Sequence, residues 1–290
     1  MDNATVADQV KIDGNQVPRF VNEFWTSKQR QSLSIHEISY RACFKAQLPR
    51  FFIELLTKRG DVIYDPFSGR GTTVIEAAIL NRKVVSNDAN PLSKIIAYPR
   101  LSVPAIEDIY SRIDLIPVDK TLKADLDLSM FYHSATEAEI VSLRRYLEDR
   151  KVGGKEDDTD RWIRMVATNR LTGHSPGFFS VYTLPPNQAV SPESQVKINK
   201  KRNQVPEYRH TRSIIKRKTK SLFRNLTPAV IGNLRESGRT ALFTECDARN
   251  TQFIKNHSVN LTVTSPPFLD VVQYSKDNWL RCWFNNIETP

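Results

Sequence analysis

The chain has 290 residues, 40% of them hydrophobic and 26% charged, which is ordinary for a globular protein able to bury a core. No apolar run approaches the roughly 18–20 residues that cross a bilayer, and Met1–Ala4 does not begin a secretory signal. We therefore expect a cytoplasmic protein without a membrane partner. Cys43, Cys246 and Cys282 lack metal-ligand spacing, so we expect no metal. The net charge of +10 favours a polyanionic partner, although general solubility explains the total equally well.

The first quarter of the chain is expected to pass from an irregular lead-in to a helix. Residues 1–20 are polar and mixed, which predicts a flexible or loosely docked segment. From Asn22 to Leu56 large apolar residues recur at helical spacing. Pro49 predicts a short turn and then a helix over about Pro49–Lys58, which Gly60 ends.

The next segment alternates strand, glycine-rich turn, helix and strand. Residues 62–67 (VIYDPF) predict a short buried strand, and residues 69–81 (GRGTTVIEAAILN) predict a turn that runs into a helix. Residues 83–91 (KVVSNDANP) predict a second strand, which ends on Asp88. This order is typical of the opening of a doubly wound nucleotide-binding sheet.

The alternation then stops and resumes late in the chain. Residues 136–150 and 157–171 have helical patterns, and strands are again predicted at residues 241–248 and 259–268. The sequence thus divides into residues 1–100, an insertion at residues 101–240, and residues 241–290. Within the insertion, residues 169–188 are rich in Gly, Pro and aromatic residues, which fits a ligand-facing loop and a packed surface loop equally well.

A basic run lies near the end of the insertion. Between Lys197 and Arg224 it has eleven cations and one acid, Glu207. A run of this kind fits contacts to phosphates, although a solvated basic face is the simpler alternative. The cations expected to make such contacts are Lys197, Lys200, Lys201, Arg202, Arg209, Arg212, Lys216, Arg217, Lys218 and Lys220.

The segment DPFSGRGTT (residues 65–73) has the properties of a ligand-binding turn. Gly69 and Gly71 allow a tight turn and a close approach of backbone to ligand, with helix N–H groups following. A lone G-x-G is equally compatible with a structural turn, and it departs from both the dinucleotide fingerprint and the P-loop. Asp65 would attract an ammonium or sulfonium group and repel a phosphate.

Acids also follow the next two predicted strands. Asp88 stands where a carboxylate can accept hydrogen bonds from both ribose hydroxyls, and Asp247 stands where a side chain can reach an adenine edge. Any one strand-end acid is more often a cap or turn residue. Three of them, with Asp65, at one edge of a sheet favour an adenosyl ligand.

The last predicted strand ends on Ser265-Pro266-Pro267-Phe268. Two consecutive prolines cannot continue a sheet ladder, because neither has an N–H to donate. They would hold the backbone extended with its carbonyl oxygens unpaired. The Ser265 hydroxyl and a neighbouring carbonyl can accept from an exocyclic amino group, while the Phe268 ring can stack on a base. Without the other motifs, a proline-capped strand end would be the better interpretation.

DPFSGRGTT followed by TSPPF resembles the S-adenosylmethionine-dependent DNA amino-methyltransferases, which modify cytosine N4 or adenine N6. The resemblance covers roughly residues 36–95 and 240–280. It implies a Rossmann-like α/β methyltransferase sheet with a largely helical insertion between the second and third core strands. The insertion would then be the target-recognition region, between a cofactor-binding half and a catalytic half. A prokaryotic or phage restriction-modification setting is also implied.

The resemblance implies roles for particular residues. Residues 36–56 look like the family's helix that helps to close the methionine pocket. The residues expected to bind S-adenosylmethionine are Tyr40, Phe44, Gln47, Asp65, Pro66, Phe67, Ser68, Gly69, Gly71, Thr72, Thr73, Asp88, Ala89, Asp247 and Ala248. The residues expected to act on the target amine are Ser265, Pro266, Pro267 and Phe268. Ser in the first position of the S-P-P-F segment looks most like the N4-cytosine enzymes.

The expected partner is double-stranded DNA, from which the target base must flip out before its amine attacks the methyl group in line. Two rivals stay open: an RNA N-methyltransferase and a non-catalytic DNA-binding subunit. One departure also matters, because the family's sheet usually has three further strands after the S-P-P-F segment. We therefore expect a truncated chain, a split enzyme completed by a second polypeptide, or a compact variant.

Overall fold

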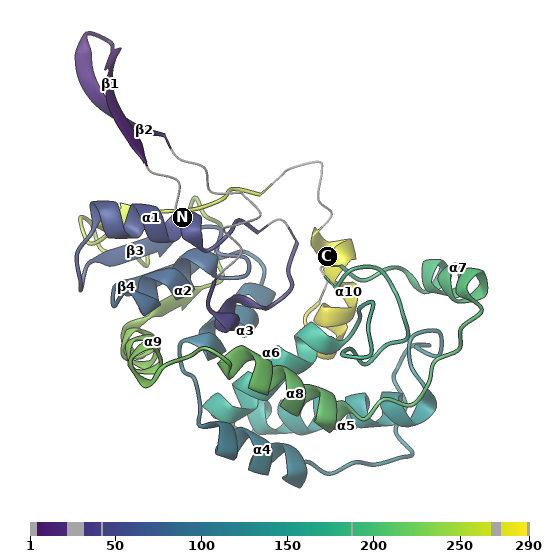
Figure 1. The fold of residues 1–290 in the computed structure, drawn as a ribbon. Helices are drawn as coiled ribbons and strands as arrows, with labels where there is room; N and C mark the ends of the chain where they lie inside the picture. Colours follow the sequence, from purple (N-terminus) through teal and green to yellow (C-terminus); the bar gives the residue numbers. More distant parts are fainter. Residues whose placement is uncertain (1–4, 22–31, 42, 187, 268–273, 289–290) are drawn as a thin grey trace.

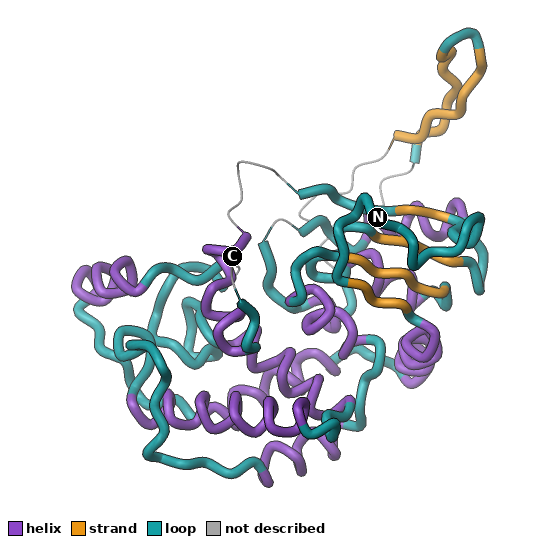
Figure 2. Tube along the Cα trace, turned by 180° about the vertical axis from the view of Figure 1, so that it is seen from behind, coloured by secondary structure: helices purple, strands orange, loops and turns teal. Residues whose placement is uncertain are grey.

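The structure is a computed structural model that describes residues 5–21, 32–41, 43–186, 188–267 and 274–288. A four-stranded parallel sheet forms one side of the molecule (Figures 1 and 2). Its strands are β3 (Val62–Asp65), β4 (Lys83–Asn87), β5 (Leu242–Thr244) and β6 (Leu261–Thr262), in the order β5-β4-β3-β6. The chain runs outward from β3 to β5 and then returns to place β6 on the other side of β3. This reversal opens a ligand crevice at the carboxyl ends of β3 and β6.

Helices pack on this sheet in the manner of a Rossmann-like fold. α2 (Thr72–Ile79) packs on β3 and β4, and it also contacts α1 (Gln47–Leu56) and α9 (Pro228–Thr240). The predicted α/β class is confirmed. α9 lies within residues 101–240, which the sequence assigned to the insertion, but it packs on α2 and β4 and leads directly into β5.

The chain between β4 and β5 is largely helical, as predicted. Its elements before α9 are α3 (Leu92–Ala97), the 3-10 helix η3 (Tyr98–Arg100), α4 (Ile106–Leu115), α5 (Ser134–Val152), α6 (Asp158–Arg170), α7 (Pro192–Arg202) and α8 (Thr211–Phe223). α6 is central, because α3, η3, α4, α8 and the C-terminal α10 (Tyr274–Phe284) all pack on it. Within the described ranges, no helix has the length and apolar character needed to cross a bilayer.

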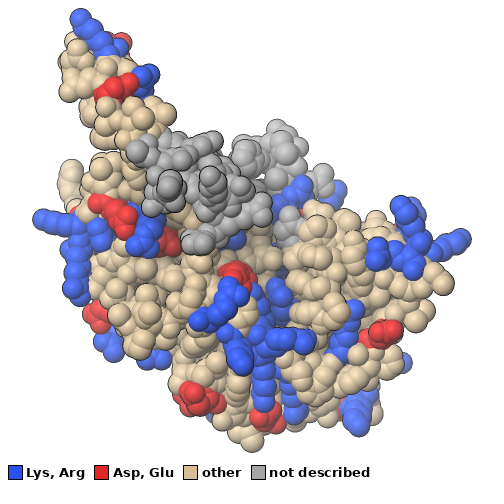
Figure 3. All heavy atoms as spheres, in the orientation of Figure 1, with Lys and Arg blue, Asp and Glu red and all other residues tan. Residues whose placement is uncertain are grey.

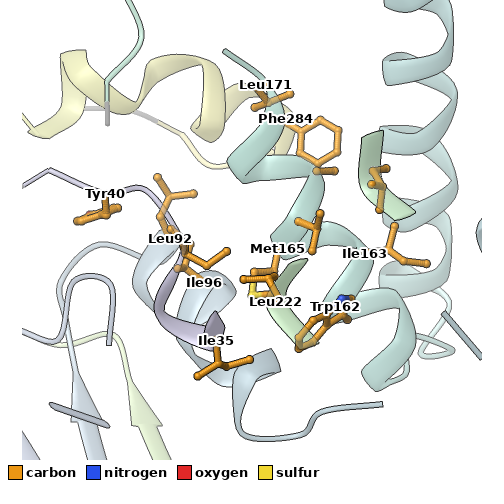
Figure 4. Close-up of a cluster of buried hydrophobic side chains, with 14 of the residues drawn as sticks. Ile35, Tyr40, Leu92, Ile96, Trp162, Ile163, Met165, Leu171, Leu222 and Phe284 are labelled. Atoms are coloured by element: carbon orange, nitrogen blue, oxygen red, sulfur yellow. The ribbon is translucent and has the colours of Figure 1, made fainter. Parts of the chain in front are cut away.

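One hydrophobic core joins the insertion to the sheet (Figure 4). Trp162 of α6 is fully buried in a cluster with Leu222 of α8 and Phe284 of α10. Ile35 and Ile96, from segments beside the sheet, belong to the same cluster. The indole N–H of Trp162 donates to a hydroxyl of α8, so this buried donor is satisfied. The helical region is therefore packed on the sheet rather than tethered to it.

The lead-in contains a β-hairpin that the sequence analysis did not predict. β1 (Val6–Ile12) and β2 (Asn15–Val21) form an antiparallel hairpin that stands away from the body (Figure 1). Asp13 and Gly14 make its turn with φ of 48° and 85°, and a two-residue turn with both values positive matches the twist of a hairpin. Asp-Gly between alternating residues was the available signal, and the polar composition of the segment obscured it.

The helical pattern expected over residues 22–56 holds only for α1 and a short 3-10 turn, η2 (Ser34–His36). Residues 22–31 and 42 lie outside the described residues. Residues 37–41 and 43–46 form no regular helix, and they run along the wall of the cavity described below. Pro49 sits in the first turn of α1, where its missing N–H costs no helical hydrogen bond.

Candidate cofactor and target-base site

A cavity of about 610 Å³ opens at the carboxyl ends of the strands. Its walls come from the loop before α1, the glycine loop after β3, the turn after β4, and the segments after β5 and β6. The predicted residues that line it are Tyr40, Phe44, Pro66, Phe67, Ser68, Gly69, Thr72, Asp88, Ala89, Ala248, Ser265 and Pro267. The volume lies within the range of pockets for small molecules and cofactors. Residues from both halves of the predicted sheet thus meet around one space.

The glycine loop connects β3 to α2 with two residues in the left-handed region. Gly69 has φ of 47° and Gly71 has φ of 77°. A Cβ atom on Gly71 would lie 2.6 Å from the Cβ of Ala97, which is closer than two carbons can pack. Gly69 faces the Tyr40 ring, and a Cβ there would meet that ring at an ordinary 3.5 Å. Gly71 therefore has both a conformational and a packing reason to be glycine.

Replacing Gly71 by Ala should destabilise the chain by about 2–4 kcal/mol, the sum of left-handed strain and overpacking. Gly154→Ala is the matched control, because Gly154 also has positive φ but has open space around its Cβ position. Urea denaturation followed by circular dichroism measures both variants. Equal losses in the two would show that the contact with Ala97 costs nothing.

Two backbone hydrogen bonds fix the Asp88 carboxylate at the start of the turn after β4. Its Oδ2 accepts from the Gly69 N–H at 2.7 Å and its Oδ1 accepts from the Asn90 N–H at 2.9 Å. Burial raises the pKa of this carboxyl, against the two backbone hydrogen bonds that lower it. Each oxygen keeps a further lone pair, so Asp88 can accept hydroxyl hydrogens from a ligand while it fixes the glycine loop.

Asp65 occupies a different position from the one its sequence context suggested. Its side chain is 2% exposed, and it does not line the cavity. Its Oδ1 accepts from the Thr264 hydroxyl at 2.6 Å and from the Phe67 N–H at 3.2 Å. Desolvation raises the pKa of Asp65 to about 6. The carboxylate thus joins the end of β3 to Thr264, the residue before the S-P-P-F segment.

The raised pKa of Asp65 predicts that Asp65→Asn increases the free energy of unfolding in a pH-dependent way. The ionised carboxylate is disfavoured in the folded state, so above pH 6 it lowers stability, whereas below about pH 3 it is neutral in both states. An amide oxygen can still accept both hydrogen bonds. We expect the variant to gain about 1–3 kcal/mol at pH 7.5 and almost nothing at about pH 3 in urea denaturation. Glu236→Gln, on the exposed side of α9, is the control, and an equal gain for Asp65→Asn at both pH values would contradict the burial argument.

Besides Asp65 and Gly71, three other residues predicted to bind the cofactor do not line the cavity. Gln47 lies in the first turn of α1 and Thr73 is buried in α2. Asp247 is exposed and paired with Arg249, whose hydrogen bonds lower the pKa of Asp247 to about 2. Its neighbour Ala248 does line the cavity, so the backbone rather than the acid of this segment reaches the site.

The S-P-P-F segment reaches the cavity from the β6 side. Ser265 and Pro267 line it, whereas Pro266 is exposed outside it. Phe268 lies outside the described residues. The Ser265 hydroxyl therefore shares one space with the glycine loop and Asp88.

The lining residues that the sequence did not predict are Arg41, Cys43, Arg70, Asn90, Pro91, Cys282, Ile287 and Glu288. Arg70 and Asn87 also tie the segments around the site together. Arg70, between the two glycines, donates to the carbonyls of Ile38 at 3.3 Å and Phe44 at 3.2 Å, which ties the wall before α1 to the glycine loop. Asn87 is 1% exposed at the end of β4. Its amide donates to the Cys246 carbonyl at 2.9 Å and accepts from the Cys246 N–H at 3.1 Å. Neither residue type predicts such a role, because the partners are far away in sequence.

The basic run separates into paired and exposed cations. The Arg209 guanidinium donates to the carbonyls of Ser175, Phe178 and Ser180, and so it holds the loop at residues 169–188. That loop is packed, with Phe179 fully buried, so the packed alternative holds. The partners of four further cations lie within the chain: the Asp114 and Ile116 carbonyls for Arg212, the Asp114 carboxylate for Lys216, Glu37 for Lys218, and the Tyr182 ring for Arg202.

Comparison with known proteins agrees with this geometry. The sequence model of the N6_N4_Mtase family, described as DNA methylase, matches residues 3–97. Type II methyltransferase M.MjaII of Methanocaldococcus jannaschii is 25% identical over 145 residues, which are 48% of this chain and 27% of that protein. Type II methyltransferase M.PvuII of Proteus hauseri is 36% identical over 80 residues, which are 26% of this chain and 24% of that protein. The chain spans about a quarter of the length of these curated relatives.

The family match falls on the segment that builds one wall of the cavity. It includes the glycine loop and Asp88, the two features that the sequence assigned to a cofactor. The cavity has the volume of a small-molecule pocket, and its walls include the aromatic residues Tyr40, Phe44 and Phe67 and the acid Asp88. The predicted resemblance is confirmed at this level: residues 3–97 match the DNA methylase family model, and the chain is similar to two Type II methyltransferases.

Proposed function

We propose that the chain is a site-specific DNA methyltransferase that transfers a methyl group from S-adenosylmethionine to an exocyclic amino group, cytosine N4 first and adenine N6 second. The single observation that carries this proposal is the shared cavity. Asp88 and the glycine loop line it on one side, and Ser265 and Pro267 line it on the other. A donor and an acceptor held in one space are what direct transfer requires.

The cofactor side of the cavity fits a nucleoside with a cationic tail. Asp88 has lone pairs free for ribose hydroxyls, and the rings of Tyr40, Phe44 and Phe67 offer apolar walls. Asp65 is proposed to act on the positive charge of the tail from behind the Phe67 backbone. S-adenosylmethionine would supply the electrophilic methyl group on its sulfonium.

The acceptor side fits an amine that is a poor nucleophile. An exocyclic amine is conjugated with its ring, so acceptors on its two hydrogens raise the electron density on nitrogen. We assign these acceptors to the Ser265 hydroxyl and the backbone carbonyl of Pro266, a residue that is itself exposed outside the cavity but stands between two residues that line it. Pro267 keeps this backbone rigid, and Phe268 would stack on the base once it has left the duplex. No covalent bond between enzyme and base is needed.

The partner proposed is double-stranded DNA, held by cations of the basic run. A second polypeptide is proposed as well, because β6 is at an edge of the described sheet and pairs there with β3 alone. That edge is where further strands would add. The relatives are Type II methyltransferases, which supports a restriction-modification setting for this chain.

The test is to incubate the purified chain with methyl-labelled S-adenosylmethionine and mixed-sequence duplex DNA, digest to nucleosides and identify the labelled one by mass spectrometry. We expect N4-methylcytosine. N6-methyladenine would keep the transfer mechanism and overturn the argument from Ser265. Label in RNA but not in DNA would show that RNA is the substrate. Cofactor binding without any transfer would favour a subunit that needs a second chain.

A further inference from the structure

α8 carries a stripe of cations on its outer face. Arg217, Lys220 and Arg224 are exposed and follow one another at steps of three and four residues, so they share one side of the helix and its end. On the inner face, Ile214 and Leu222 are buried in the main core. α8 is therefore a rigid support for the stripe. The stripe itself is about 10 Å long at 1.5 Å per residue.

Two neighbouring cations of α8 are paired within the chain. Lys216 pairs with Asp114 at 2.6 Å, and Lys218, which is 11% exposed, lies 3.6 Å from Glu37. Arg224 of the stripe shares Glu37 at 2.5 Å, whereas among the described residues no carboxylate pairs with Arg217 or Lys220. Net positive charge therefore remains on the outer stripe. Figure 3 shows Lys and Arg gathered over α8 near the middle of this face of the molecule.

The end of α8 adjoins the cavity wall. The Ser34 hydroxyl donates to the Leu222 carbonyl at 2.7 Å, and Glu37 accepts from Arg224 at 2.5 Å and from Ser221 at 3.0 Å. Tyr40, which lines the cavity, follows Glu37 by three residues. A polyanion on the stripe would therefore lie close to the wall of the site.

α7 offers a contrast, because it carries three exposed lysines where the stripe carries one lysine and two arginines. Lys197, Lys200 and Lys201 are exposed, but the helix lies at the periphery of the helical region (Figures 1 and 3). Gln195 is its one fully buried residue, and this side chain fastens α7 through the Tyr182 carbonyl at 3.0 Å. Removing three charges from either helix changes the net charge equally, so a comparison of the two distinguishes an effect of position from an effect of total charge.

We infer that the outer stripe of α8 (Arg217, Lys220 and Arg224), and not α7, is the surface that contacts the phosphates of duplex DNA, with Glu37 as an internal counter-ion that a phosphate displaces from Arg224. This inference rests on the proposed function, since it takes DNA as the partner. A stripe of about 10 Å spans roughly three phosphates of one strand. Contact with each phosphate releases counter-ions, so the stripe should set the salt dependence of binding.

The experiment measures binding of the full chain to a mixed-sequence duplex from 50 to 200 mM salt, by fluorescence anisotropy and without cofactor. The α8 variant is Arg217→Gln/Lys220→Gln/Arg224→Gln, and the control is Lys197→Gln/Lys200→Gln/Lys201→Gln, which removes the same charge. For α8 we expect the slope of log K against log salt to fall by about 2–3, at about 0.9 per phosphate. The control should keep its slope and an affinity within twofold. Glu37→Gln should raise the affinity about threefold or more at 50 mM salt.

Two results would overturn the inference. The first is an equal loss of DNA affinity in both triple variants, which would show attraction by net charge alone. The second is an unchanged slope of log K against log salt in the α8 variant. A preference for duplex RNA that vanishes in the α8 variant would overturn DNA as the partner. Thermal denaturation of each variant confirms folding. Because binding is measured without methyl transfer, an inactive chain can still support the inference, and an active chain can still refute it.

Discussion

Asp88→Asn should weaken the binding of S-adenosylmethionine by the purified chain about 10- to 100-fold, measured by calorimetric titration. Hydrogen bonds to a charged acceptor contribute about 1.5–3 kcal/mol, and about 1.4 kcal/mol is a tenfold change in affinity. An amide has one oxygen, so it cannot accept from Gly69 and Asn90 on separate atoms and also from ribose hydroxyls. The glycine loop would lose its support together with the ligand contact.

Asp247→Asn is the control for this effect. Asp247 is also a strand-end acid, but its side chain is exposed and paired with Arg249 outside the cavity. The affinity of this variant should stay within twofold of the parent chain. Strong binding by Asp88→Asn together with weak binding by Asp247→Asn would move the cofactor to another part of the sheet edge.

Ser265→Ala should slow methyl transfer about 100-fold while the affinity for the cofactor changes less than twofold. Loss of one preorganised hydrogen-bonding group at a reacting centre typically costs about 10²–10³ in rate. Ser265 follows β6 and Asp88 follows β4, on either side of β3, and so removal of the Ser265 hydroxyl should act on the amine and not on the cofactor. Single-turnover transfer with labelled cofactor measures the first quantity, and titration of the same sample measures the second.

Thr262→Ala is the matched control, because this hydroxyl stands on the exposed side of β6, three residues before Ser265. Its transfer rate should match that of the parent chain. A Ser265→Ala variant with unchanged transfer would leave the Pro266 carbonyl as the acceptor on the amine. It would also remove the argument for cytosine N4.

Local sequence patterns predicted the elements that build the glycine loop and the acid beside it. The order of strand, glycine loop, helix and acid is written in consecutive residues, and Gly71 and Asp88 take up the conformation and contacts that this order requires. The helical insertion was also readable, since α5 and α6 have long periodic patterns. Patterns of this kind depend on neighbours within a few residues.

Contacts between distant segments could not be predicted in the same way. The bond from Thr264 to Asp65 joins residues almost two hundred positions apart, and it withdraws an acid from the cavity that its motif placed there. Arg209 was expected to meet phosphates, yet three carbonyls of one packed loop occupy its guanidinium. The sequence gives the charge of a side chain, but only the fold determines which group it pairs with.

Photolabelling of the purified chain with methyl-labelled S-adenosylmethionine, followed by tryptic digestion and mapping of the label, locates the bound cofactor. We expect saturable label on the peptide of residues 60–70, which carries Phe67 and Gly69, or on the peptide ending at Arg41, which carries Tyr40. Excess S-adenosylhomocysteine should remove it. Saturable label confined to the hairpin or to the helices of the insertion would show that the cofactor binds elsewhere, because those residues lie outside the cavity.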